Sequence, residues 1–244
     1  MIFLVREFTI TDLLRFNFQL FDMDKDQDIF HLTEKYLKEY GELYGDELLL
    51  DNTLVLSDRL PYSSLEEMCE AIKDCKRCVL GSTRTSFVFG VGDAHARMVL
   101  VGEAPGREED LQGEPFVGRA GQLLNKILKA LNLKREEVYI ANVIKCRPPN
   151  NRDPFQDEIR ECEPYLKLQL KLINPHVIIA LGRVAAQSLL KINLSLAQMR
   201  GKVFKYQNID LMVTYHPAAL LRNPGLKRPC WEDWKLIRDK YLQR

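Results

Sequence analysis

The stretch MVLVGEAPG, residues 98–106, is the part of the sequence that best indicates the fold. Four apolar residues, two of them β-branched, are followed at once by glycine, glutamate and a Pro-Gly pair. A short apolar run without polar alternation is typical of a strand that is buried on both faces, as in a parallel sheet. The segment therefore predicts a buried strand whose carboxyl end carries a polar loop beginning at Gly102 and Glu103.

Three further apolar runs of this kind follow along the chain, over residues 138–143, 177–181 and 211–215. Helical patterns lie around and between the four runs, over residues 64–74, 121–131, 157–173, 184–190 and 231–242. Alternation of buried strands with helices predicts an α/β fold of three layers, α/β/α, with a central four-stranded parallel sheet. Ligands of such sheets bind outside the carboxyl ends of the strands. The polar residues at those ends are therefore the first candidates for a site.

The first 61 residues differ from the rest of the chain in charge. They hold 6 Lys or Arg and 13 Asp or Glu, whereas residues 62–244 hold 29 and 21, within a chain of net charge +1. We therefore expect an acidic N-terminal extension of unknown role over residues 1–61, with a helix over 32–44, and one folded domain over 62–244. A basic domain suggests a polyanionic partner such as DNA, although charges of this size also occur on surfaces that are only solvated.

Composition places the chain among globular proteins, with 244 residues of which 46% are hydrophobic and 28% charged. No apolar run reaches the length of a membrane span, and the apolar start of the chain is too short for a signal peptide. We expect a cytoplasmic protein, monomeric and without membrane contact.

Four of the six cysteines have the spacing of a metal site. Cys75 and Cys78 are separated by two residues, and Cys146 and Cys162 by fifteen. In a reducing compartment such a set indicates a metal rather than disulfides, and both zinc and a [4Fe–4S] cluster accept four thiolates. Spacing alone leaves the two metals open, and buried cysteines without metal are a third interpretation. Because the ligands would join the segment before the first strand to the loop after the second, we expect a structural role.

The chain also resembles a known family, the iron–sulfur uracil-DNA glycosylases of the thermostable type often called family 4. The resemblance covers residues 65–240 and rests on five segments and the four cysteines. The segments are GEAPG at 102–106, GEPFVGRAG at 113–121, NVIKCRPPNNR at 142–152, HP at 216–217 and LLRNP at 220–224. It implies a [4Fe–4S] cluster rather than zinc as the metal. A related subgroup crosslinks to DNA through a histidine in a basic insert, which residues 142–162 lack, so we expect turnover.

The resemblance implies roles for residues in the strand-end loops. Phe116 stacks on a base extruded from DNA, and Asn142 pairs with uracil N3–H and O4. His216 faces uracil O2, where negative charge develops. Glu103 is the nearest carboxylate for placing water, while the next position, Ala104, lacks the Asp of better-known relatives. The catalytic candidates are thus Glu103, Asn142 and His216.

Further residues are candidates for base selection and for binding DNA. Gly102 and Ala104 contribute the loop that faces the base, and Glu109 either excludes the methyl group of thymine or favours a helix N-terminus. An apolar wedge that helps expel the base is expected from the LLRNP segment, with arginines on phosphates. The DNA-binding candidates are Arg119, Asn151, Arg152, Arg183, Leu220, Leu221 and Arg222.

Taken together, these residues predict a monofunctional uracil-DNA glycosylase of base excision repair, a hydrolase that acts on single- or double-stranded DNA. The absence of an Asp after Glu103 keeps open a non-catalytic iron–sulfur module that binds DNA. A zinc-stapled protein whose acidic extension binds a partner is a third possibility.

Overall fold

The computed structural model describes residues 8–9, 35, 47–48 and 60–242, and the chain divides into two compact units, Met1–Arg59 and Leu60–Arg244. In the first unit, β1 (Phe8–Thr9) pairs antiparallel with β2 (Glu47–Leu48). Of the helix expected over residues 32–44, only Lys35 is described. The proposed extension thus lies largely outside the described residues.

The second unit is built on a sheet with the strand order β3-β5-β4-β6-β8-β7. The strands are β3 (Val91–Gly92), β4 (Met98–Gly102), β5 (Tyr139–Asn142), β6 (Val177–Leu181), β7 (Val203–Tyr206) and β8 (Ile209–Thr214). The four inner strands, β5, β4, β6 and β8, run parallel, which confirms the predicted parallel sheet. Two short edge strands that the sequence analysis did not predict, β3 and β7, pair antiparallel and extend the sheet to six strands.

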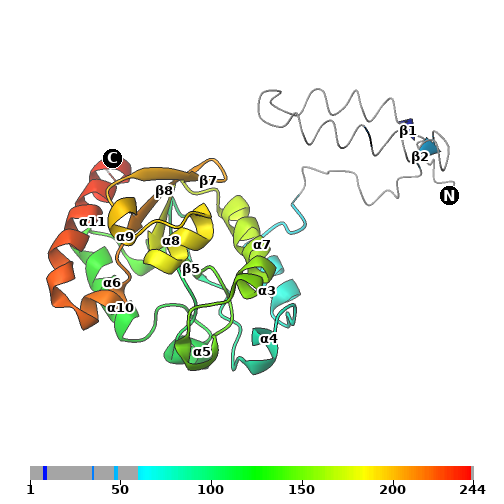
Figure 1. Ribbon diagram of the computed structural model, residues 1–244, viewed down its shortest axis with the longest axis horizontal. Coiled ribbons are helices and arrows are strands. Elements are labelled where there is room, and N and C mark those ends of the chain that lie inside the picture. The colour runs from blue at the N-terminus through cyan, green and yellow to red at the C-terminus, as the bar shows by residue number, and fades with distance from the viewer. Residues whose placement is uncertain (1–7, 10–34, 36–46, 49–59, 243–244) are drawn as a thin grey trace. The chain divides into compact units, whose positions relative to one another are not determined.

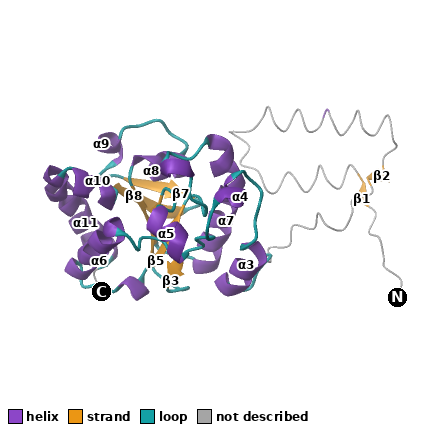
Figure 2. Ribbon diagram, turned by 90° about the horizontal axis from the view of Figure 1, so that it is seen from below, coloured by secondary structure: helices purple, strands orange, loops and turns teal. Residues whose placement is uncertain are grey.

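Helices cover both faces of this sheet (Figures 1 and 2). The longer ones are α3 (Leu65–Ile72), α6 (Arg119–Ala130), α7 (Gln156–Ile173), α8 (Arg183–Leu190) and α11 (Lys227–Tyr241). Shorter helical segments are α4 (Leu80–Thr83), α5 (Arg107–Gln112), α9 (Leu196–Met199), α10 (Pro217–Arg222), η2 (Arg135–Glu137), η3 (Pro149–Asn151) and η4 (Pro224–Leu226). The three layers expected from the alternation of elements are therefore present.

The two faces of each inner strand contribute to separate apolar cores, because successive side chains of a strand point to opposite faces. In β4, Val99 and Val101 belong to the core under α3, α7 and α8. Met98 and Leu100 belong to the core under α6 and α11. All four side chains are at most 2% exposed, as expected of a parallel strand covered on both sides. This burial fixes the register of the strand and so the position of its carboxyl end.

None of the described helices is both long enough and apolar enough to cross a membrane.

Candidate active site

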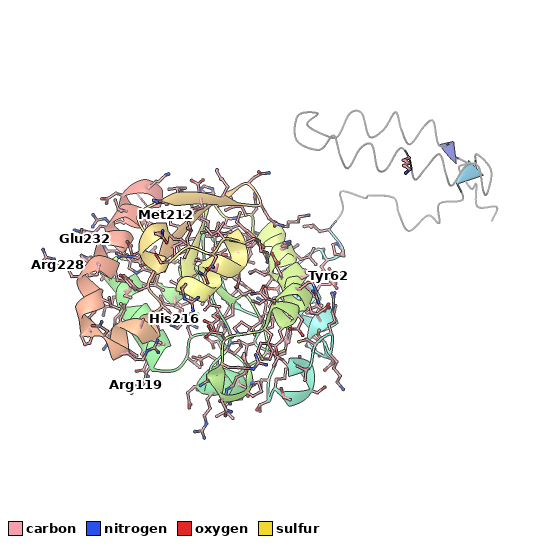
Figure 3. The ribbon with its side chains drawn as sticks, viewed as in Figure 1. Tyr62, Arg119, Met212, His216, Arg228 and Glu232 are labelled. Atoms are coloured by element: carbon pink, nitrogen blue, oxygen red, sulfur yellow. The ribbon has the colours of Figure 1, made fainter. Side chains whose placement is uncertain are left out.

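The carboxyl ends of the four parallel strands surround one cavity of about 540 Å³. The loop after β4 contributes Glu103, β5 contributes Asn142, the turn after β6 contributes Arg183, and the end of β8 contributes His216. Figure 3 labels His216, which directly precedes α10 (Pro217–Arg222). The structure thus brings together the residues that the strand-end argument placed at one edge of the sheet.

Asn142 presents a buried amide whose Oδ1 has no hydrogen-bond partner among the described residues. The side chain is 2% exposed and lines the cavity. A Cβ at Gly102 would lie 2.4 Å from this Oδ1 and 2.7 Å from the ring of Phe116, so only glycine fits there. An unpaired buried acceptor costs about 1–3 kcal/mol, and its position indicates a ligand that donates a hydrogen bond.

Phe116 is held against the cavity by an unusual backbone conformation. Its φ is +54°, a left-handed value that few residues other than glycine adopt, and its side chain is 5% exposed. The close approach of Gly121, whose Cβ would overlap the carbonyl oxygen of Phe116, allows this bend. The ring lies 5.4 Å from the ring of His216, centroid to centroid, at 36°. One aromatic face is therefore preorganised next to the imidazole.

The carboxylate of Glu109 holds three backbone N–H groups around the same cavity. Its Oε2 accepts from Gly106 at 3.1 Å, and its Oε1 accepts from Val117 and Gly118 at 3.0 Å each. The residue lies in the first turn of α5 and lines the cavity, so it braces the loop after β4 against the Phe116 loop. Neither role suggested by the sequence included this bracing of two loops.

His216 is a neutral imidazole with a defined tautomer. Burial, with a smaller contribution from the positive charge of Arg222, lowers the pKa of His216 to about 4. Its Nδ1 accepts a hydrogen bond from the N–H of Ala218 at 3.1 Å, which leaves the ring proton on Nε2. The sequence could not indicate this protonation state. A neutral ring with a fixed Nε2–H is a hydrogen-bond donor that carries no charge into the cavity.

A buried network fixes the strand that carries His216. Asp233 of α11 is 3% exposed and accepts from Arg200 Nε and Nη2 at 2.7 and 2.9 Å. The same carboxylate accepts from the hydroxyl of Thr214 at 2.7 Å, two residues before His216. Arg200 also donates to the hydroxyl of Tyr215 at 3.0 Å. The sequence analysis missed this network, whose members are far apart in the chain.

Glu103 lies in the cavity with a carboxyl group that ionises near neutrality. Burial, with a smaller contribution from the negative charge of Asp153, raises the pKa of Glu103 to about 7, and Arg183 opposes this shift. Arg183 Nη2 and Asp153 Oδ2 form an ion pair at 3.6 Å on the cavity wall. Glu103 thus changes from acid to base in the range where a catalytic carboxylate is most useful. Ala104 lines the cavity beside it.

The candidates for DNA binding divide into exposed and buried groups. Arg119 is exposed at the start of α6, and Asn151, Arg183 and Arg222 line the cavity with exposed side chains (Figure 3 labels Arg119). Arg152 lines it too, but it donates through Nη1 and Nη2 to the buried Glu158 at 2.8 and 2.6 Å.

The two leucines expected to supply the wedge differ in exposure. Leu220 is 2% exposed and packs in the core under α6 and α11, whereas Leu221 is 38% exposed. The structure therefore presents Leu221, and not Leu220, to a partner.

The four spaced cysteines line a second, small cavity together with Phe87 and Tyr165. Several donors point at their sulfur atoms. The pairs are Arg84 Nη1 to Cys146 at 3.1 Å, the N–H of Lys145 to Cys162 at 3.3 Å, Tyr165 hydroxyl to Cys75 at 3.3 Å, and the N–H of Arg77 to Cys75 at 3.5 Å. Among the described residues, no three Cys, His, Asp or Glu side chains are arranged to hold a single metal ion. The four thiols and the donors that face them are groups that a metal site with thiolate ligands requires.

Lys145, which the motifs in the sequence did not single out, contacts one residue of each cavity, Asn142 and Cys162. Its side chain is fully buried, and Nζ donates to the carbonyl of Asn142 at 2.9 Å and to Gln169 Oε1 at 2.6 Å. Burial lowers the pKa of Lys145 to about 8. A lone lysine between Ile144 and Cys146, in an otherwise apolar run, was the available signal.

An α/β domain with a strand-end pocket of this kind defines a protein that binds a planar polar base. The space where the base would lie is lined by the aromatic ring of Phe116, the unpaired amide of Asn142 and the neutral imidazole of His216. Comparison with known proteins agrees with this class. A family model described as the uracil DNA glycosylase superfamily matches residues 89–236.

Curated relatives of the chain share most of the described domain. A type-4 uracil-DNA glycosylase from Archaeoglobus fulgidus is 46% identical over 182 residues, which are 71% of this chain and 92% of the relative. One from Sulfurisphaera tokodaii is 48% identical over 185 residues, 72% and 84% of the two chains. One from Thermotoga maritima is 43% identical over 173 residues, 69% and 90%. The chain belongs to the uracil DNA glycosylase superfamily and, within it, to the type-4 uracil-DNA glycosylases.

Proposed function

We propose that this enzyme hydrolyses the bond between uracil and deoxyribose in DNA and leaves an abasic site without cutting the strand. The observation that carries the proposal is the orphaned Oδ1 of Asn142, buried in the pocket beside the ring of Phe116. The N3–H of uracil can donate the hydrogen bond that this acceptor lacks. Cytosine has an acceptor at N3, so its binding would leave Asn142 unpaired at a cost of about 1–3 kcal/mol.

Extrusion brings the base into contact with groups that favour its departure. Phe116 offers a fixed face on which the extruded pyrimidine stacks in place of its lost neighbours. Nε2–H of His216 donates toward uracil O2, where the leaving anion gathers charge. Because this donor is neutral and fixed by Ala218 and the Asp233 network, it needs no rearrangement as the bond breaks.

Water must reach the sugar on the opposite side from the departing base. Glu103 is the carboxylate placed for this, and Ala104 leaves room beside it. Because the pKa of Glu103 is raised to about 7, the ionised form that accepts a proton from water is present above that pH and lost below it.

A pH profile tests this role of Glu103. We expect kcat/KM for uracil release to rise through pH 7 and to level off above it. The Glu103→Gln variant should lower kcat/KM at pH 8 about 100-fold, the low end of the usual contribution of a general base, and remove the rise. Glu108→Gln, an exposed neighbour in α5, is the matched control and should keep the full profile. A Glu103→Gln enzyme with the unchanged pH dependence would show that another group titrates.

DNA is held around the pocket mouth by exposed cations and one apolar side chain. Arg119, Arg183 and Arg222 are the phosphate contacts, and Asn151 lies on the same rim. Leu221 is the wedge that enters the base stack.

The cysteine cavity holds a [4Fe–4S] cluster through Cys75, Cys78, Cys146 and Cys162. Burial raises the pKa of Cys162 to about 12, so this thiol ionises only when a cation compensates for its charge. The donors from Arg84, Lys145 and Tyr165 stabilise the sulfur atoms once ionised. Bound to these four residues, a cluster would crosslink the segment between α3 and α4 and helix α7 to the loop after β5, a structural role apart from the hydrolysis. We place the enzyme in the cytoplasm, because its reducing conditions keep cysteines free of disulfides and none of the six cysteines of the chain forms one.

Base release from a defined oligonucleotide tests the function directly. A strand with one uracil is incubated with the full chain, and the free uracil is measured. The length of the strand is then compared before and after treatment with alkali. We expect free uracil, an intact strand before alkali and a cut strand after it. Tight binding without release of uracil would favour the non-catalytic DNA-binding module, and strand cleavage before alkali would exclude a monofunctional enzyme.

A further inference from the structure

Phe155 is an aromatic side chain whose exposure has no evident structural reason. Its side chain is 57% exposed, whereas every other aromatic residue in the described part of the chain is buried or only partly exposed. It precedes α7, at the end of the loop that leads from the cysteine cavity past the uracil pocket. A large apolar group held in water at the edge of a binding site is characteristic of a contact surface.

The ring is held in place before any partner arrives. Arg152 lies over one face, with its guanidinium carbon 3.7 Å from the ring centroid. The guanidinium is itself fixed by two hydrogen bonds to the buried Glu158, and the backbone N–H of Phe155 donates to the same carboxylate at 2.8 Å. Ordering such a ring on binding therefore costs little conformational entropy.

The neighbours of Phe155 place it between two adjoining cavities. Arg152 and Asp153 line the uracil pocket. Pro154 and Gln156 line another cavity, of about 440 Å³, which lies between α7 and α8 and is distinct from the cysteine cavity. The two cavities share Asp153, Arg183 and Val184 as a common wall. When uracil occupies the uracil pocket, the next nucleotides of the same strand therefore pass close to Phe155.

The charges around the ring favour a base over a phosphate as its partner. The cation nearest the ring, Arg152, is already paired with Glu158 at 2.6 Å. Asp153 and Asp157 flank Phe155, and residues 153–157 contain no Lys or Arg. Such a segment repels a phosphate, whereas an aromatic ring stacks on a base of any sequence. Arg183, on the wall that the two cavities share, and Lys191, which lines only the cavity between α7 and α8, supply the positive charge that the backbone needs.

We propose that Phe155 stacks on an unpaired base next to the extruded uracil on the same strand, an inference that rests on the proposed function. In a duplex the neighbouring base is paired and stacked within the helix, so the ring gains little. In single-stranded DNA that base is free to leave its neighbours and cover the exposed face. Phe155 thereby gives the enzyme a preference for single strands.

Binding of an uncleavable substrate analogue tests the stacking. The probe is an oligonucleotide with 2′-fluoro-deoxyuridine, used single-stranded and as a U:G duplex. Phe155→Ala should raise the Kd for the single strand about 5- to 100-fold, the range for loss of one stacked base, and leave the duplex Kd within about twofold. Phe155→Trp should restore tight binding. Leu236→Ala, which removes a 49% exposed leucine from α11, is the matched control and should change neither Kd.

Fluorescence gives a readout that a change in folding would not mimic. With 2-aminopurine placed next to the 2′-fluoro-deoxyuridine, on each side in turn, the wild-type protein should quench the probe at one position and Phe155→Ala should not. Equal weakening on both DNA forms, no weakening, or unchanged quenching would overturn the proposal. A wild-type enzyme that releases no uracil would contradict the proposed function. Release of uracil with an unaffected Phe155→Ala variant would contradict the stacking alone.

Discussion

Replacement of His216 by alanine is expected to slow uracil release about 100- to 1000-fold, which is the usual effect of removing one donor from an oxyanion site. The imidazole is neutral because the pKa of His216 is lowered to about 4, and its Nε2–H is the donor that the proposed mechanism directs toward the leaving base. The loss should fall on the rate of bond breaking, measured under single-turnover conditions, more than on the affinity for DNA. The contribution of the neutral ring should persist from pH 5 to pH 9 and be lost only as the pH falls through about 4.

Two comparisons separate this chemistry from a structural effect. The substitution also removes the acceptor for Ala218 N–H at the start of α10, which costs about 1 kcal/mol of stability. His216→Asn keeps an acceptor and a donor on a shorter side chain and should recover part of the rate. His95→Ala, at an exposed histidine outside the pocket, should keep the full rate. An unaltered single-turnover rate in His216→Ala would remove the histidine from the mechanism.

Loss of the proposed cluster is expected to have the second large effect. The Cys162→Ala variant should purify with little iron. Its free energy of unfolding should be lower by several kcal/mol, which is a fraction of the roughly 10–16 kcal/mol that a structural metal contributes to folding. The reason is that a cluster bound to the four sulfur atoms would tie α7 and the segment before α4 to the loop after β5. Iron content, the visible absorption of the protein and thermal unfolding measure the change.

The remaining cysteines supply the control for this prediction. Cys69, which does not line the cysteine cavity, can be replaced by alanine and should leave iron content and unfolding close to those of the wild type. The wild-type chain should carry about four iron atoms. One zinc per chain and no iron would show that the cysteines hold a different metal. If Cys162→Ala does not fold, the iron content of the wild type still decides between these outcomes.

The sequence predicted the centre of the sheet better than its edges, and the physical reason lies in burial. The inner strands are apolar on both faces, so their residues form unbroken apolar runs. β7 alternates exposed and buried residues over Val203–Tyr206, and its hairpin turn uses Gln207 and Asn208, both at positive φ, without a glycine. β3 is only two residues long. Short, half-exposed edge strands carry a weaker pattern.

The site could be predicted as far as topology determines it. Strand ends of one parallel sheet must meet at one edge, so the grouping of Glu103, Asn142 and His216 followed from the strand assignments. Which atoms are buried, and with what partners, depends on packing between distant segments. The tautomer of His216 and the burial of Leu220 therefore required the three-dimensional structure.

The carboxylate of Glu109 couples the width of the pocket to its rigidity. Its oxygens hold Gly106, Val117 and Gly118 together at the wall that faces the base. A designer who shortened this side chain to admit a bulkier pyrimidine would also release three backbone donors and loosen the loop that fixes Phe116. Widening the substrate range at this position therefore cannot be separated from softening the enzyme, and a useful redesign has to supply a new acceptor for the same three N–H groups.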